Sequence, residues 1–102
     1  MKILCLWRVK DGADMSKVGD LLEAEEVFAW NLVKRDALRE HYESDMPVPA
    51  ISIMEADSVE AAKAMTVDLP INKAGYLEPE YFPLRPFSNW EVLFQDKFKT
   101  SA

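Results

Sequence analysis

The sequence predicts a small α+β domain with the element order βαββαβ. Residues 2–10 and 50–55 are apolar on both faces when read as strands, and residues 14–34 and 57–68 carry apolar side chains at helical spacing. Turn-forming residues separate these segments. The 102 residues, of which 49% are hydrophobic, fit one globular domain and exclude a disordered chain.

The first strand is expected over residues 2–10, and its two apolar faces require cover on both sides. Asp11-Gly12 then forms a turn. A helix is expected to start near Asp14 or Ser16, since either side chain can cap it, and to end near residue 34.

One carboxylate interrupts the apolar stripe of this first helix. At about 100° per residue, the inward residues are Val18, Leu21, Leu22, Phe28, Ala29 and Leu32. Glu25 lies at the centre of their arc. Val27 and Trp30 lie off the stripe, on the nominally polar side, and we interpret them as a contact between subunits.

A second strand of mixed polarity is expected over residues 38–43. Strict alternation puts Arg39, His41 and Glu43 on one face, and Tyr42 on the other face with Leu38 and Glu40. The sequence leaves open which of these faces meets the helices.

A turn over residues 44–49 leads to the third strand, residues 50–55. The second helix is expected to begin at an Asp57 cap and to run to about residue 68, with Pro70 as its stop.

The last strand is expected over residues 76–84, at the edge of the sheet, because Pro79 and Pro83 lack the N–H groups that an inner strand needs. Residues 89–94 alternate again and indicate a short strand or arm. The single domain with its arm therefore covers residues 1–95, and residues 96–102 are expected to be a loose tail.

This element order defines the split βαβ, or ferredoxin-like, unit, in which both helices cover one face of an antiparallel sheet. The other face needs cover as well, because the first and third strands are apolar on both sides. We expect the same face of a second subunit to provide it, which gives a homodimeric α+β barrel.

Composition excludes several functions. The net charge of −6 argues against nucleic acid as a partner, because phosphate binding needs clustered Lys and Arg. One cysteine and one histidine leave no intrachain disulfide and no metal site with a recognisable ligand spacing. Neither a membrane span nor a secretory signal is recognisable, so a cytoplasmic protein is expected.

Five stretches together resemble the muconolactone-isomerase-like family of dimeric α+β barrels. They are EEVFAWNL (25–32), LREHYESD (38–45), ISIMEADSVEAAKA (51–64), LPINKAGYLEPEYFPL (69–84) and PFSNWEVLF (86–94). One departure is Asp36-Ala37, where relatives often place a glycine after the first helix.

The activity for which this family is named is a cofactor-free shift of a proton along an unsaturated lactone ring. The resemblance therefore implies a small-molecule ligand and no cofactor. Many relatives have no known reaction, and related barrels include cofactor-free monooxygenases.

Glu25 and His41 are the candidate catalytic residues. A carboxylate in a dry pocket has a raised pKa, which suits proton transfer near neutral pH. The alternative is a structural ion pair of Glu25 with Arg8 or Arg39. His41 is the one side chain whose ordinary pKa lies near neutrality, and the alternative for it is a purely structural hydrogen bond.

The candidate substrate-binding residues are Arg8 or Arg39 as a clamp for an anion, and Trp7, Tyr42 and Trp90 as the walls of the pocket. An ion pair of Arg8 with a neighbouring Glu is an equally good interpretation.

The first hypothesis is thus an isomerase acting on a small unsaturated lactone or related ring metabolite. The alternative is a non-catalytic small-molecule-binding or accessory barrel protein, and a cofactor-free monooxygenase is a third possibility. A cavity of about 300 Å³ or more with convergent polar groups favours an enzyme or a binder over a purely structural role.

Overall fold

The computed structural model describes residues 1–95, so the tail expected over residues 96–102 lies outside the described part. Four strands form one antiparallel sheet in the order β2-β3-β1-β4. They are β1 (Lys2–Val9), β2 (Leu38–Glu43), β3 (Ala50–Glu55) and β4 (Leu77–Leu84).

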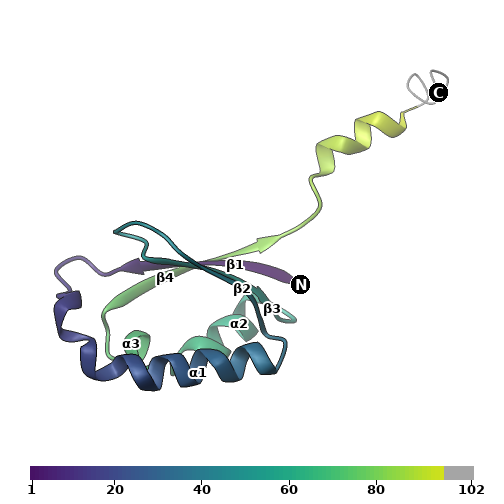
Figure 1. The fold of residues 1–102 in the computed structure, drawn as a ribbon. Helices are drawn as coiled ribbons and strands as arrows, with labels where there is room; N and C mark the ends of the chain where they lie inside the picture. Colours follow the sequence, from purple (N-terminus) through teal and green to yellow (C-terminus); the bar gives the residue numbers. More distant parts are fainter. Residues whose placement is uncertain (96–102) are drawn as a thin grey trace.

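Three α-helices lie on one face of this sheet (Figure 1). They are α1 (Leu22–Lys34), α2 (Val59–Thr66) and α3 (Pro70–Lys73). The α+β ferredoxin-like fold is therefore confirmed, and α3 is an additional short helix. No helix within residues 1–95 is both long enough and apolar enough to cross a bilayer.

The strand order explains the two prolines of β4. Among the described residues this strand pairs only with β1, so its other edge has no strand partner there, and the loss of N–H groups at Pro79 and Pro83 is tolerated. β1 lies between β3 and β4, where Cys5 is opposite Ser52 on one side and Tyr81 on the other.

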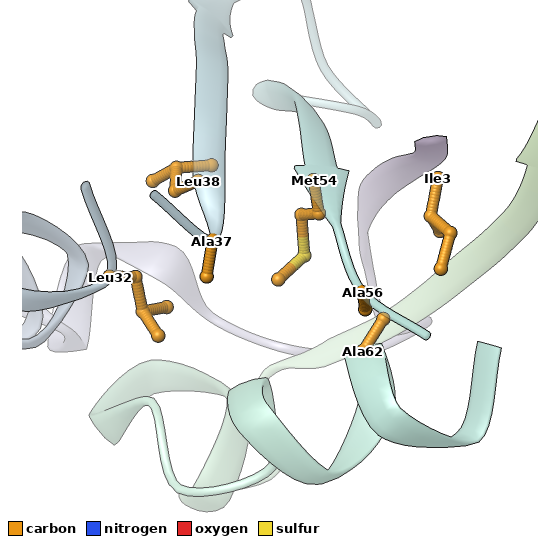
Figure 2. Packing of buried hydrophobic residues seen from close by; sticks show 7 residues of the cluster. All are labelled: Ile3, Leu32, Ala37, Leu38, Met54, Ala56 and Ala62. Atoms are coloured by element: carbon orange, nitrogen blue, oxygen red, sulfur yellow. The ribbon is translucent and has the colours of Figure 1, made fainter. Parts of the chain in front are cut away.

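The main core lies between the sheet and the helices (Figure 2). It consists of Ile3, Leu32, Ala37, Leu38, Met54, Ala56 and Ala62. A second cluster joins Cys5, Trp7 and Leu69. Leu22 was expected inside but is half exposed, because it borders an open cavity rather than packed side chains.

The start of the first helix differs from the prediction. Asp14 does act as a cap, since its carboxylate accepts the backbone N–H of Ser16 at 3.0 Å, but it caps only a 3₁₀ turn, Met15–Lys17. A second 3₁₀ turn, Gly19–Leu21, precedes α1. Gly19 explains the interruption, because glycine costs about 1 kcal/mol relative to alanine inside a helix.

The cap of α2 is Ser58 rather than Asp57. Ser58 has an extended backbone, and its hydroxyl accepts the backbone N–H of Ala61 at 3.0 Å. The helix ends at Thr66, and Pro70 opens α3 instead of stopping α2. Proline suits the first turn of a helix because the N–H it lacks has no intrahelical partner there.

A β-bulge breaks the strict alternation expected along β2. Leu38 pairs with Met54 and His41 pairs with Ser52, both on the helix-covered face, while the register shifts between Leu38 and Glu40. The grouping of Leu38 with Tyr42 is therefore wrong. The extra residue in the bulge turns Leu38 to the same face as His41.

The C-terminal arm is helical, not a strand. Residues Ser88–Phe94 form a 3₁₀ helix that extends away from the sheet, as the yellow-green segment of Figure 1 shows. Trp90 is 68% exposed on this arm and stacks edge-to-face on Phe87, with ring centroids 5.9 Å apart. The alternating apolar residues of the arm are thus presented to the outside instead of to a neighbouring strand.

Candidate functional site

A cavity of about 470 Å³ lies between α1 and the helix-covered face of the sheet. Most of its wall is apolar, from residues such as Val18, Leu22 and Leu69. The polar or ionisable groups that reach it are Trp7, Glu25, Glu26, His41, Tyr42, Glu43, Ser52 and Thr66. Its volume exceeds the lower limit of about 300 Å³ for a small-molecule site, so a purely structural interior is disfavoured.

Glu25 reaches this cavity from the inner face of α1. Its carboxylate accepts the backbone N–H of Ile71, at the start of α3, at 3.3 Å. Burial raises the pKa of Glu25, and the nearby carboxylate of Glu26 acts in the same direction, although the hydrogen bond from Ile71 opposes both.

Neither arginine expected as a partner of Glu25 is near it. Arg8 lies on the opposite face of the sheet and forms a salt bridge with Glu80. The Arg39 guanidinium donates to the backbone carbonyl of Asp36. Within residues 1–95, Glu25 therefore has no salt-bridge partner, and the expected ion pair with Arg8 or Arg39 is not formed.

His41 enters the same cavity from β2. Its Nδ1 lies 2.8 Å from the hydroxyl of Ser52, and the same hydroxyl accepts the indole N–H of Trp7 at 2.8 Å. One serine on β3 thus connects residues of β1 and β2 across three neighbouring strands. Ser52 is only 1% exposed and its bond to Trp7 is buried, whereas its bond to the exposed His41 is partly buried.

Sequence reasoning missed Ser52. The available signal was a lone hydroxyl on an otherwise apolar strand face, between Ala50 and Met54. A buried hydroxyl needs a hydrogen-bond partner, so Ser52 could have been predicted to form a hydrogen bond with a residue of a neighbouring strand.

Two of the three expected wall residues line the cavity. Trp7 forms part of its floor and is packed edge-to-face against Tyr81, with centroids 6.2 Å apart. Tyr42 borders it from the edge strand, but Tyr42 pairs with Ile51, so its side chain lies on the face opposite the helices, where its hydroxyl donates to Glu40 at 2.7 Å. Trp90 lies on the projecting arm and does not line it.

Neither predicted anion clamp lines the cavity. Arg8 is on the far face of the sheet, and Arg39 borders a separate shallow depression near the end of α1. The structure brings Glu25, His41 and Trp7 together, leaves Tyr42 at the border of the cavity, and leaves both arginines outside.

Cys5 is a core residue. It is fully buried, and burial raises the pKa of its thiol to about 12, so the reactive thiolate is not formed near neutral pH. In the part of the chain that is described, no three His, Cys, Asp or Glu side chains are grouped so that they could hold a metal ion.

No protein-family model and no curated protein sequence matches the chain, but solved structures do. One is 5-chloro-2-hydroxyhydroquinone dehydrochlorinase from Burkholderia phenoliruptrix AC1100, solved with 2,5-dihydroxybenzoquinone. It shares 15% identity at a TM-score of 0.70, over 87% of this chain and 98% of that one.

Muconolactone isomerase is a second structural neighbour. It shares 24% identity at a TM-score of 0.68, over 85% of this chain and 91% of that one. These identities establish the architecture and not the chemistry. The chain has the fold of muconolactone isomerase, as its sequence resemblance predicts.

Proposed function

We propose that this protein shifts a proton within a small unsaturated ring compound that carries a carbonyl group, such as a lactone. The observation that carries the proposal is the convergence of Glu25 and His41, from α1 and β2, on one largely apolar cavity of about 470 Å³. Glu25 has no cationic partner within residues 1–95 and has a raised pKa, which suits it to accept and return a proton.

The reaction uses these two side chains in different roles. The Glu25 carboxylate takes a proton from a ring carbon, and the electron pair left behind spreads through the double bond onto the carbonyl oxygen. His41 stabilises that oxygen. Glu25 then returns the proton to another carbon of the same conjugated system, so the double bond moves and no atom is lost.

The structural neighbours support a ring compound as the ligand. One of them is named as an isomerase of a lactone, and the other was solved with a quinone. Both names describe unsaturated rings that carry carbonyl oxygens, and the apolar wall of the cavity suits such a ring.

Proton exchange with solvent tests the proposal directly. Unsaturated γ-lactones are incubated with the protein in D₂O, and loss of the ring proton signal is followed by NMR. We expect catalysed exchange that Glu25→Gln lowers by about 10²-fold or more, which is the usual contribution of a general base. Glu23→Gln is the matched control, because it removes an exposed acid of the same helix outside the cavity.

Full exchange activity in Glu25→Gln would refute the assignment. Binding of lactones without any exchange would instead favour the second candidate, a non-catalytic binding protein. The cavity supports that candidate equally, because its volume and apolar wall fit a ligand whether or not chemistry follows.

We also propose that the functional unit is a homodimer formed through the open face of the sheet. That face carries Leu4, Leu6, Ile51, Ile53, Phe82 and Leu84, and no helix within residues 1–95 covers it (Figure 1). An apolar sheet face of this extent is a typical interaction surface. A second copy covers it with identical residues, as a two-fold interface requires.

Charge substitution tests this association. Leu6→Lys places a charge in the middle of the open face and is expected to convert dimers to monomers in light-scattering measurements of mass. The comparison variant is Val27→Lys, on the exposed face of α1. A dimer that survives Leu6→Lys but not Val27→Lys would place the interface on α1, at the exposed residues Val27 and Trp30.

A further inference from the structure

We propose that the cavity selects an uncharged ring compound and holds it by a carbonyl oxygen that accepts a hydrogen bond from Nε2 of His41. This inference rests on the proposed function and specifies the class of its substrate. Two independent observations lead to it: the charges that line the cavity, and the hydrogen bonds that surround Ser52.

The charges are unbalanced. Three carboxylates line the cavity, those of Glu25, Glu26 and Glu43, and the only basic side chain among its described lining residues is His41. Both arginines that could have offset these charges bond to other groups, Arg8 to Glu80 and Arg39 to a backbone carbonyl.

A ligand carboxylate would therefore enter a site that already holds acidic groups and offers it no guanidinium or ammonium. Like charges placed together in a partly desolvated site oppose binding. An uncharged ring avoids that repulsion and still gains from the apolar wall formed by residues such as Val18, Ala29 and Leu69.

The hydrogen bonds around Ser52 determine which nitrogen of His41 carries the proton. The indole N–H of Trp7 can only donate, so it uses one lone pair of the Ser52 oxygen. Ser52 has one hydrogen to donate in return, and Nδ1 of His41 at 2.8 Å is the acceptor available to it within the described residues.

The opposite arrangement is unfavourable. If Nδ1 carried the hydrogen, the Ser52 hydroxyl would accept from both Trp7 and His41, and its own hydrogen would lack a partner in a site with 1% exposure. Unpaired buried donors are costly. Neutral His41 is therefore held as the Nε2–H tautomer, and the group it offers to a ligand is a donor.

These observations assign a separate role to each of three side chains. His41 donates a hydrogen bond to the carbonyl oxygen of the ligand, and Glu25 takes the proton from the ring carbon. Ser52 is a positioning residue that acts through His41. The Trp7 indole supports Ser52 from the next strand.

Two probe ligands test the selection by charge. One is the unsubstituted α,β-unsaturated γ-butyrolactone, and the other is the same ring with a carboxymethyl group, which is anionic at pH 7. NMR titration of the wild-type protein is expected to show at least about tenfold tighter binding of the uncharged probe. Glu43→Gln and Glu26→Gln are expected to narrow that ratio, because each removes one of the opposing charges.

Tighter or equal binding of the anionic probe would overturn the inference, and so would the absence of shifts at cavity residues with both probes. The control variant Glu60→Gln, on α2 outside the cavity, is expected to leave the ratio unchanged.

The tautomer is tested in the free protein. His41 is the only histidine of the chain, so its ¹⁵N signals need no further assignment. In the neutral imidazole, Nε2 is expected to show the pattern of a nitrogen that carries hydrogen, and Nδ1 that of a nitrogen without hydrogen. Ser52→Ala is expected to produce a mixture of tautomers, whereas Ser58→Ala, which removes only the α2 cap, is not. A bare Nε2 in the wild-type protein would overturn the inference.

The binding titration and the tautomer measurement test this inference separately from the proposed function, because neither experiment requires the protein to catalyse a reaction. Selective binding of the uncharged lactone without proton exchange would remove the proposed reaction and keep the inference. Proton exchange that is faster with the carboxylate-bearing ring would support the proposed reaction and refute the inference that the cavity selects uncharged rings.

Discussion

Ser52→Ala provides the most direct test of the hydrogen bonds in the site. The substitution changes the side chain only by the loss of one oxygen, so it leaves little empty volume. It does leave the indole N–H of Trp7 without an acceptor, and Trp7 is only 6% exposed. The Nδ1 atom of His41 loses the same partner, but His41 is exposed and water can replace it.

The expected cost follows from that difference. An unsatisfied buried donor costs about 1–3 kcal/mol, and this term applies to Trp7 but not to His41. Ser52→Ala should therefore lower the free energy of unfolding by about 1–3 kcal/mol. For a domain of this size, each kcal/mol corresponds to a decrease in Tm of about 4–8 °C.

A double-mutant cycle isolates the bond. In the Trp7→Phe background the indole donor is absent, so Ser52→Ala should cost about 1–3 kcal/mol less than in the wild type. Urea unfolding followed by far-ultraviolet circular dichroism measures all four proteins at one protein concentration, because self-association adds to apparent stability. Equal costs of Ser52→Ala in the two backgrounds would refute the reasoning.

Three further predictions concern a pH dependence, a thiol and a turn. Burial raises the pKa of Glu25 above its ordinary value of 4.5. The protonated side chain therefore contributes fully to stability below pH 4.5, and this contribution is lost as the pH rises through the pKa of the folded state. Glu25→Gln cannot ionise, and should raise Tm more at pH 7 than at pH 4. Because burial raises the pKa of Cys5 to about 12, disulfide reagents at pH 8 should label its thiol only after unfolding in guanidinium. Asp36 has a φ of 60°, so Asp36→Gly should raise the free energy of unfolding by about 0.5–1 kcal/mol in urea titrations.

Each of these has a clear contrary result. An equal gain in Tm at both pH values would mean that Glu25 ionises as easily in the folded as in the unfolded protein. Rapid labelling of Cys5 in the native protein would mean that the strand interior opens readily. A destabilised Asp36→Gly would mean that the aspartate side chain stabilises the turn more than glycine relieves its backbone.

The sequence was sufficient for the fold because its signals are local and repeat. Strands with two apolar faces, prolines that allow only an edge position and a helical stripe each depend on a few neighbouring residues. The departure at Asp36-Ala37, where relatives often place a glycine, leaves the turn itself in place, because Asp36 adopts the left-handed backbone that glycine favours.

The candidate site was only partly predictable, because it depends on contacts between distant segments. Glu25 stood out since it interrupts an apolar stripe. Ser52 did not, because its role exists only where three strands bring Trp7 and His41 to one hydroxyl. The face on which Arg8 lies followed from alternation along β1, but the sequence did not say which face the helices would cover.

The arm shows a different limit. Apolar residues at every second position in 89–94 indicate a strand only if a neighbouring strand is available, and β4 already ends at Leu84. Since residues 1–95 offer no such neighbour, the local hydrogen bonds of a 3₁₀ helix satisfy the backbone of Ser88–Phe94 instead.

The bulge in β2 has a consequence for how this strand tolerates changes in length. Because the register absorbs one additional residue between Leu38 and Glu40, deleting Arg39 would bring these two into regular alternation and keep Leu38 opposite Met54 and His41 opposite Ser52. Deleting Glu40 has the same effect on the register, because Arg39 then lies opposite Ile53, whereas a one-residue deletion within residues 41–43 would invert part of the strand. Positions 39 and 40 are thus where a homologue that is one residue shorter can have its gap in this strand and still retain the same cavity.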